Sequence, residues 1–501
     1  MKKLRLNPTT LSFLPILIFI PLSYDILRHI HFGGVDLLSE FTLAAFFPNL
    51  NSDILFSLVY RLNETIFIAF TSWLISIIFG IFFGLLSSDI FYKILNLPLI
   101  FSKLIKVILI IIRSIHELVW GLLLMQIYGI NISVGIISIC IPYIAINAKV
   151  INEQLENIDF RIIQSILEVN GNKLSSLITL IWVPILNTLK NFGIYRLECA
   201  LRSTIILGLF GLGGIGTSIY LSFKALSFRE LWTYLWSLGI LIIVFRITFN
   251  LIKFKKINSK FLILISTILL FLSIFSIFYF LNFILNPYSE ITLKNINNLY
   301  ILKSNFIPHD FLKLISETIV LSISATAIAI SLPPVCALII NNQFGIFSIR
   351  LISFCFRLIP PPITILILLI FNEPSISLAA LSLGLYNAAI TNKLLTANLN
   401  TLEKNELIAI ESIGASKRLS WLLGLFSKQA KSYLGYCAYR SDVLIRETAI
   451  VGIIGSIGLG WQLQESISAL AWGEVSIILF AYSSIAIIGE LINGKIKANF
   501  I

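Results

Sequence analysis

Two stretches of this chain decide its organisation, and each is a copy of the other. Residues 195–216 read YRLECALRSTIILGLFGLGGIG and residues 439–460 read YRSDVLIRETAIVGIIGSIGLG, at a constant shift of 244 positions. Nine of the 22 aligned positions are identical, and an acid, Glu198 or Asp442, is kept between the arginines. The identical pairs are Tyr195/Tyr439, Arg196/Arg440, Arg202/Arg446, Thr204/Thr448, Ile206/Ile450, Gly208/Gly452, Gly211/Gly455, Gly214/Gly458 and Gly216/Gly460. Outside the copies, Glu64-Thr65 matches Glu317-Thr318 at a shift of 253. The pattern predicts two related halves.

The composition indicates that both copies lie in a membrane protein. Of 501 residues, 57% are hydrophobic and 12% are charged, and the mean hydropathy is +0.94. A soluble domain with a polar surface is less apolar than this. The net charge of +12 is therefore first a sign of topology, because basic residues resist translocation. Since no soluble basic domain accompanies it, we expect no nucleic-acid partner.

The apolar runs predict about twelve transmembrane helices, at roughly 20 residues for each crossing. The run at 97–130 could hold two crossings, but the basic loops would then face outside, so we predict one long or broken helix. An even number of crossings in each half makes the repeats parallel. We therefore predict an all-α polytopic fold with a first repeat over 1–256, a second over 257–501, and both termini cytoplasmic. The runs are 9–29, 65–87, 97–130, 132–148, 190–210, 231–252, 260–286, 317–341, 344–371, 374–392, 432–453 and 474–492.

Nothing in the sequence predicts a metal site, a cofactor or catalysis. The five cysteines and four histidines have neither CxxC nor Cys/His ligand spacing. Residues 489–496 approach a phosphate-binding loop, but Ile496 stands where the hydroxyl residue should be and no strand precedes it. We expect no metal, no cofactor and no enzymatic activity of the chain itself.

A charged stripe runs along each copy. In a helix, Tyr195, Glu198 and Arg202 share one face, and Glu198 with Arg202 forms an i, i+4 pair. Charge near the middle of a bilayer is costly and usually faces the bundle interior or a water-filled path. The stripe predicts either a translocation path with affinity for an anion, or self-neutralised pairs that hold neighbouring helices together.

The glycines and the long loops give two more candidate sites. The glycines end the helix and suit either a gate hinge or close helix packing; they are Gly208, Gly211, Gly214, Gly216, Gly452, Gly455, Gly458 and Gly460. The loops at 161–184 and 404–427 both predict a short helix, a glycine turn and a second helix, with Glu168/Gly171 matching Glu411/Gly414. Each loop is a docking surface for a paired cytoplasmic partner or an ordinary connector.

These residues together resemble the permeases of ABC importers, specifically those of the phosphonate type. The resemblance covers roughly 60–250 and 315–492 and rests on the Tyr-Arg stretch with its glycines, the loops with Lys149 and Lys393, and RSIHELVW at 113–120. Arg357 corresponds to Arg113 at the shift of 244. The chain departs from the family pattern where His116 replaces a proline and where 360–362 is Pro-Pro-Pro with no glutamate. The loop glutamates lie three residues before the glycine instead of six, and the closing proline is absent from the second loop.

The resemblance implies an ABC importer type I permease that moves a phosphonate, phosphite or phosphate across the bacterial inner membrane. It implies two copies of a cytoplasmic ABC ATPase on the loops, a periplasmic substrate-binding protein, and the lipid bilayer as surroundings. A permease for another small solute, such as methionine, and an ion-coupled secondary transporter remain alternatives. The residues expected to line the path or gate are Tyr195, Arg196, Glu198, Arg202, Tyr439, Arg440, Asp442, Arg446, Arg113 and Arg357.

Overall fold

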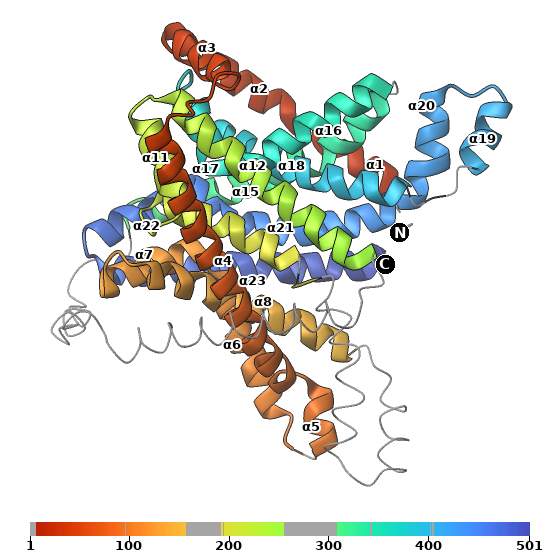
Figure 1. Ribbon diagram of the computed structural model, residues 1–501. Helices are drawn as coiled ribbons and strands as arrows, with labels where there is room; N and C mark the ends of the chain where they lie inside the picture. The colour runs from red at the N-terminus through yellow and green to blue at the C-terminus, as the bar shows by residue number, and fades with distance from the viewer. Residues whose placement is uncertain are drawn as a thin grey trace. The chain divides into compact units, whose positions relative to one another are not determined.

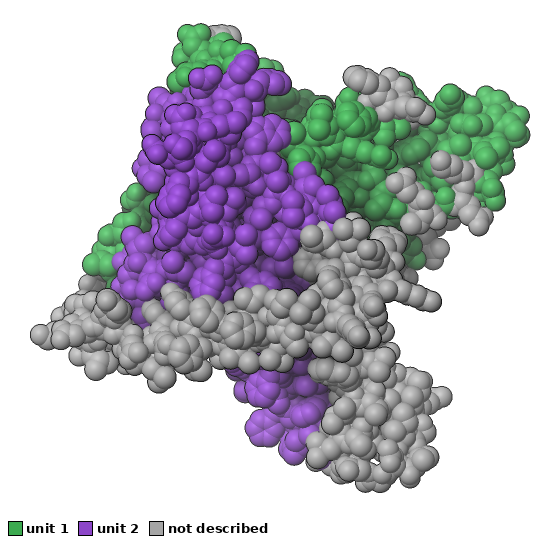
Figure 2. Space-filling model, viewed as in Figure 1, with its two compact units in different colours: residues 1–43, 302–501 green, residues 44–301 purple. Residues whose placement is uncertain are grey.

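The computed structural model describes residues 7–95, 97–156, 192–193, 195–254, 308–340, 343–400, 402 and 405–500. Within these ranges the secondary structure is helical, apart from one isolated bridge between Ile30 and Asn372. The chain divides into two compact units, coloured separately in Figure 2. Unit 1 comprises residues 1–43 and 302–501, and unit 2 comprises residues 44–301. The predicted repeat boundary after residue 256 lies outside the described residues, so it stays a prediction.

Unit 2 is built around the pair of helices α4 and α8. Small residues let these helices approach, since a Cβ added to Gly80 would lie 2.5 Å from the Cβ of Asn147. The amide of Asn147 donates to the backbone oxygen of Ser76 at 3.0 Å, so the polar group is satisfied inside the pair. The helices of unit 2 are α4 (Ser52–Leu86), α5 (Asp89–Leu95), α6 (Ile100–Ser114), α7 (Glu117–Tyr128), α8 (Ile132–Glu156), a helix over 195–209, α11 (Ile215–Lys224) and α12 (Phe228–Phe254).

Unit 1 contains the N-terminal segments and the helices from α15 onward, most of which are labelled in Figure 1. The N-terminal segments are α1 (Pro8–Phe13), η1 (Leu14–Ile18), α2 (Phe19–Arg28), η2 (Phe32–Gly34) and α3 (Val35–Ala44). The others are α15 (Phe311–Ile339), α16 (Gln343–Leu358), α17 (Pro361–Leu368), α18 (Ile376–Asn400), α19 (Asn405–Ser412), α20 (Lys417–Ser420), the π-helical η3 (Trp421–Phe426), α21 (Ser427–Gly455), α22 (Gly458–Ser468) and α23 (Trp472–Phe500).

The N-terminal helices pack against helices that lie more than 280 positions away in the chain. Helix α1 contacts α15 and α21, and α2 contacts α18. Leu22 is buried in a cluster with Leu321 and Ile328, and the amide of Asn372 donates to the backbone oxygen of Ile26 at 2.9 Å. The predicted first transmembrane helix at 9–29 therefore belongs to unit 1, which also contains the second copied stretch, residues 439–460.

The described part of the chain contains 6 helices long and apolar enough to cross a membrane, or up to 9 if each bent pair of helices is one span. Helices α6 and α7 are such a pair, bent by 86°, so the long run at 97–130 is broken, as one of the two predicted forms. The run at 260–286 lies outside the described residues, and a total of twelve crossings stays a prediction. An outer face of the N-terminal helices carries exposed Leu14, Leu17, Ile20, Tyr24 and Leu27, as expected beside lipid.

Helix α5 of unit 2 has no counterpart among the described residues of unit 1. Helix α5 fills the link between α4 and α6, whereas in unit 1 α15 ends at Ile339 and α16 begins at Gln343. Asp89 holds this link because its carboxylate accepts from Ser102 Oγ at 2.6 Å and from Lys106 Nζ at 2.9 Å. Burial raises the pKa of Asp89, but these hydrogen bonds and the lysine charges outweigh it, and the pKa is lowered.

Candidate functional site

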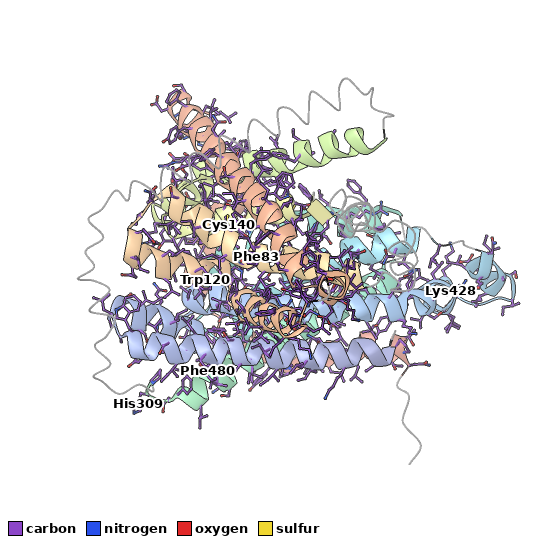
Figure 3. All side chains as sticks on the ribbon, turned by 90° about the horizontal axis from the view of Figure 1, so that it is seen from below. Phe83, Trp120, Cys140, His309, Lys428 and Phe480 are labelled. Atoms are coloured by element: carbon purple, nitrogen blue, oxygen red, sulfur yellow. The ribbon has the colours of Figure 1, made fainter. Side chains whose placement is uncertain are left out.

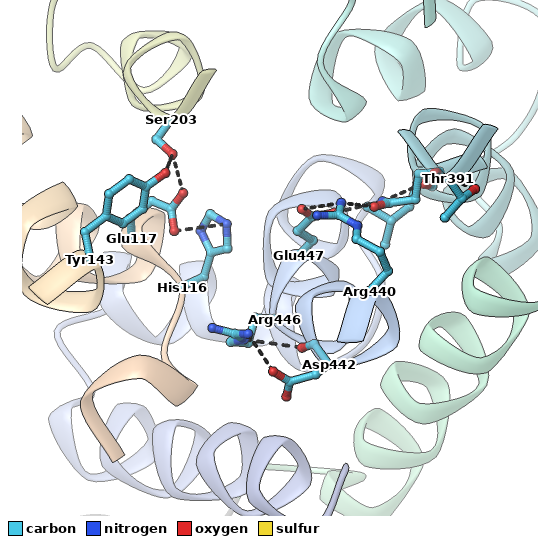
Figure 4. A network of polar contacts seen from close by, with 11 residues as sticks. His116, Glu117, Tyr143, Ser203, Thr391, Arg440, Asp442, Arg446 and Glu447 are labelled. Carbon is cyan, nitrogen blue, oxygen red and sulfur yellow. Dashed lines mark hydrogen bonds and ion pairs between the residues drawn. The ribbon is translucent and has the colours of Figure 1, made fainter. Parts of the chain in front are cut away.

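Both predicted acid–arginine pairs form on the two copied stretches, residues 195–216 and 439–460. Arg202 Nη2 lies 2.6 Å from Glu198 Oε1, and Arg446 Nη2 lies 2.8 Å from Asp442 Oδ2. The four side chains are between 11% and 24% exposed, so the charges are largely withdrawn from the surface of their units. Because each arginine has an acid one helical turn before it, each pair carries no net charge. The pair in unit 1 is drawn in Figure 4.

A second network surrounds Arg196, which is buried in unit 2. Its guanidinium lies 3.7 Å from the ring centroid of Tyr143 on α8. The hydroxyl of Tyr143 is 2.9 Å from Ser203 Oγ, and Ser203 donates to Glu117 Oε1 at 2.5 Å. Glu117 also lies 3.3 Å from Nε2 of His116 (Figure 4). The network connects three elements: the helix over 195–209, α8 and the start of α7.

The equivalent Arg440 has a different set of partners in unit 1. Its guanidinium donates to Oδ1 of Asn387 on α18 and lies 3.6 Å from Glu447 Oε1. The amide of Asn387 donates to Glu447 Oε2 at 2.9 Å, which closes the network (Figure 4). Asn387 occupies the position of Tyr143, and Glu447 that of Ser203, at the shift of 244. Arg196 is therefore held against α8 and Arg440 against α18, at corresponding sequence positions but by different chemistry.

Two pairs of the predicted glycines form helix crossings. A Cβ added to Gly216 would lie 2.1 Å from the backbone oxygen of Ile205 and 3.0 Å from the Cα of Gly208. A Cβ on Gly460 would lie 3.1 Å from the Cα of Gly452. These contacts are the close packing that was one of the two sequence interpretations, and the hinge stays a prediction.

The remaining glycines shape the turn between the crossing helices. Gly214 directly precedes α11 with a φ of +79°, Gly458 is the first residue of α22 with a φ of +60°, and Gly211 has a φ of +89°. Side chains with a Cβ rarely adopt this left-handed region. Gly455 differs because it is the last residue of α21, where an added Cβ would be 2.7 Å from Ile365 Cδ1.

The sequence interpretation missed a capping contact that occurs in both units. The backbone N–H of Ile215 donates to Thr65 Oγ1 at 2.8 Å, and the N–H of Leu459 donates to Thr318 Oγ1 at 3.0 Å. The N–H of Gly458 also donates to Glu317 Oε2 at 3.1 Å. The first N–H groups of a helix have no partner within it, so these side chains satisfy the starts of α11 and α22. The repeated Glu-Thr pair was the signal that could have revealed the contact.

The predicted loop at 404–427 has the expected helix, glycine turn and helix. Gly414 has a φ of +89° between α19 and α20, and its N–H donates to the backbone oxygen of Glu411 at 3.0 Å. Ile413 is 82% exposed at this turn, and Figure 1 shows α19 and α20 side by side. Lys428 Nζ lies 2.5 Å from Glu406 Oε1 and fixes α19 to the start of α21; Figure 3 labels Lys428. Glu168 and Gly171 of the first loop lie outside the described residues.

The other predicted residues lie on these same helices or next to them. Arg113 is buried at the end of α6, and Arg357 on α16 donates through Nε to the backbone oxygen of Ser353 at 3.2 Å. The ring of Tyr195 lies 6.2 Å from that of Phe192, and the ring of Tyr439 lies 6.4 Å from that of Tyr436. No group of three potential metal ligands occurs among the described residues.

Comparison with known proteins finds permeases of phosphorus-compound transport systems. The chain is 27% identical over 121 residues to the phosphite transport system permease protein HtxE of Stutzerimonas stutzeri, over 24% of this chain and 46% of that protein. It is 19% identical over 419 residues to the phosphate-import permease protein PhnE of Mycolicibacterium smegmatis, over 78% of this chain and 76% of that protein.

A third relative is the phosphite transport system permease protein PtxC of Stutzerimonas stutzeri, 23% identical over 26% of this chain and 48% of that protein. The chain thus spans about half the length of each phosphite permease that it matches. No family model matches the chain. Together with the apolar helices, these similarities make the chain a multi-pass membrane protein similar to transport permeases.

Proposed function

We propose that the chain is the permease of an ABC importer for a small phosphorus oxyanion, such as a phosphonate, phosphite or phosphate. The observation that carries this proposal is the similarity to a phosphate-import permease over 78% of the chain. The names of the two phosphite permeases add the same class of solute. In this proposal the two related halves are fused permease repeats, and the chain lies in a bacterial inner membrane with both termini cytoplasmic.

The ATP would be hydrolysed by a separate subunit, of which two copies dock on the cytoplasmic loops. The hairpin of α19 and α20 supports this assignment, because Ile408, Ile413 and Leu419 are exposed on it while Ser416 caps α20 by accepting from the N–H of Leu419. An ordered hairpin with exposed apolar side chains suits a helix that fits into a partner's groove. A periplasmic binding protein would deliver the solute at the opposite face of the membrane.

The acid–arginine pairs give the proposed path its chemistry. A phosphorus oxyanion accepts charge-assisted hydrogen bonds, which guanidinium groups donate well. Because Arg202 and Arg446 are already neutralised by Glu198 and Asp442, an anion would compete with the acid for the arginine. Such competition keeps binding weak, and a weak site releases a solute that has to pass through.

The test is uptake into vesicles that contain the chain, its ATPase and its binding protein. ATP-dependent uptake of phosphite, phosphate or methylphosphonate is the expected result, and an ATPase with an inactivated phosphate-binding loop abolishes it. Uptake driven by a proton or sodium gradient without ATP would instead identify a secondary transporter. Methionine serves as the control solute. ATP-driven uptake of methionine alone would contradict the proposed oxyanion substrate but would agree with an ABC importer.

A further inference from the structure

Near the buried arginines, the two halves carry an acid at different aligned positions. Glu117 is the first residue of α7, and the corresponding first residue of α17 at the shift of 244 is Pro361. Ser203 on the helix over 195–209 corresponds to Glu447 on α21. At each of the two positions, one half has an acid and the other half a neutral residue, in opposite combinations.

Within its own unit, each acid belongs to a network with two corresponding residues: Tyr143 and Arg196 in unit 2, and Asn387 and Arg440 in unit 1. Glu117 connects through Ser203 to the hydroxyl of Tyr143, on whose ring Arg196 lies. Glu447 accepts from Asn387, the residue at the position of Tyr143, and lies 3.6 Å from the arginine at the position of Arg196. One carboxylate therefore closes each network, although it comes from a different helix in each unit.

The energetics of burial favour one carboxylate in each network. Arg196 and Arg440 are 6% and 5% exposed, and a buried charge is costly unless an opposite charge compensates it. Two acids in one network would repel each other, whereas a network without an acid would lack the carboxylate that the described contacts place near each arginine. A single acid at either position satisfies this requirement. The Pro-Pro-Pro sequence at 360–362, which contains no acid, then goes together with Glu447.

We propose that each half requires one buried carboxylate to position Arg196 or Arg440, and that the site of residues 117 and 361 and the site of residues 203 and 447 are interchangeable sources of it. Only the uptake measurement that tests this proposal rests on the proposed transport function. The two units then differ in which helices the carboxylate connects. In unit 2 the carboxylate ties α7 to the helix over 195–209, whereas in unit 1 the acid and the arginine both lie on α21.

The experiment moves the acid in unit 1 of the full-length chain. The variants are E447S, P361E and the double variant E447S/P361E. We expect uptake per folded molecule to fall at least about tenfold in each single variant, because E447S removes the carboxylate from the network and P361E adds a second one. The double variant should recover more than half of the wild-type uptake per folded molecule. Pro361 and Glu117 are both the first residue of their helix, so the new glutamate starts from the position of the native one.

Two control variants separate charge from packing. E447Q removes the charge at nearly constant volume, so it should lose uptake even if E447S fails to fold. E447S/P362E moves the acid by one residue, which turns it by about 100° around the helix, and it should not recover uptake. The mirror pair in unit 2 is E117Q against E117Q/S203E, with the same expected loss and recovery.

A second readout does not depend on transport. The thermal midpoint of the purified chain should fall in each single variant and return in each double variant. If the wild type transports no phosphorus oxyanion, the proposed function fails and the midpoints still decide the inference. Double variants whose midpoints stay low overturn the inference. It is also overturned if E447Q transports at the wild-type rate per folded molecule, or if a double variant folds but does not transport beside an active wild type.

Discussion

Replacing Gly216 with alanine puts a methyl group where two backbones already touch. The new Cβ would lie 2.1 Å from the backbone oxygen of Ile205. Since carbon-to-carbonyl contacts are normally about 3.3 Å, the helices must separate by about 1.2 Å at this point. The same substitution at Gly460 starts from 2.6 Å to the oxygen of Ala449, so about 0.7 Å of separation suffices. The two substitutions repeat one chemical change with different geometric demands.

These distances predict an order of stability. Overpacking of this kind costs about 1–3 kcal/mol, and alanine returns up to about 1 kcal/mol of helix propensity. We expect Gly216→Ala to destabilise unit 2 by about 2 kcal/mol and Gly460→Ala to destabilise unit 1 by at most about 1 kcal/mol. Gly494→Ala is the matched control, because no atom lies within 4 Å of its added Cβ on α23. It should stabilise by up to about 1 kcal/mol.

The assay is thermal unfolding of the purified full-length chain in detergent. A loss of about 2 kcal/mol corresponds to a midpoint lower by roughly 4–8 °C for a unit of this size. The reasoning is wrong if Gly216→Ala is as stable as Gly494→Ala, because the close approach would then not exist. Equal losses at Gly216 and Gly460 would show that the difference between 2.1 and 2.6 Å does not govern the packing.

Three further substitutions test other contacts. Thr318→Val should destabilise unit 1 by about 1–3 kcal/mol, because the buried N–H at the start of α22 loses its acceptor, and urea or thermal unfolding measures it. Arg446→Gln should lose both stability and uptake, because Asp442 then lies buried without its cation; the Asp442→Asn double variant should recover stability but not uptake. Asp89→Asn should lower the midpoint at neutral pH, by an amount that shrinks in acid. The folded pKa of Asp89 lies below its ordinary value of 3.8, so its contribution is present above that pH and is lost as the pH falls through the folded pKa. A midpoint difference that does not change between pH 7 and pH 3 would contradict the assignment.

The features that the sequence predicted well depend on neighbours within one helix turn. The pairing of Arg202 with Glu198 and of Arg446 with Asp442 follows from i, i+4 spacing alone. The glycine turn at Gly414 is equally local, since its left-handed backbone requires a residue without a Cβ. The break in the run at 97–130 was left open by the sequence, and the bend between α6 and α7 decided it.

The contacts that the sequence could not predict join distant segments. The acceptor for the N–H of Ile215 is Thr65, 150 positions earlier, although the repeated Glu-Thr pair was visible. The partner helix of Arg196, and the source of its carboxylate on α7, required the positions of three helices in space. A search for matching residues also misleads here, because the two halves place their carboxylates at different positions.

The sequence by itself determined that the chain is apolar, helical and duplicated in its central stretch, because hydropathy and helical spacing act over a few residues. It also determined the i, i+4 pairs of Arg202 with Glu198 and of Arg446 with Asp442. Only the tertiary structure decided that four of the glycines form helix crossings, that Leu22 packs beside Ile328, and that Glu117 and Glu447 close equivalent networks. The physical reason is that packing joins side chains whose separation in sequence is unrelated to their distance in space.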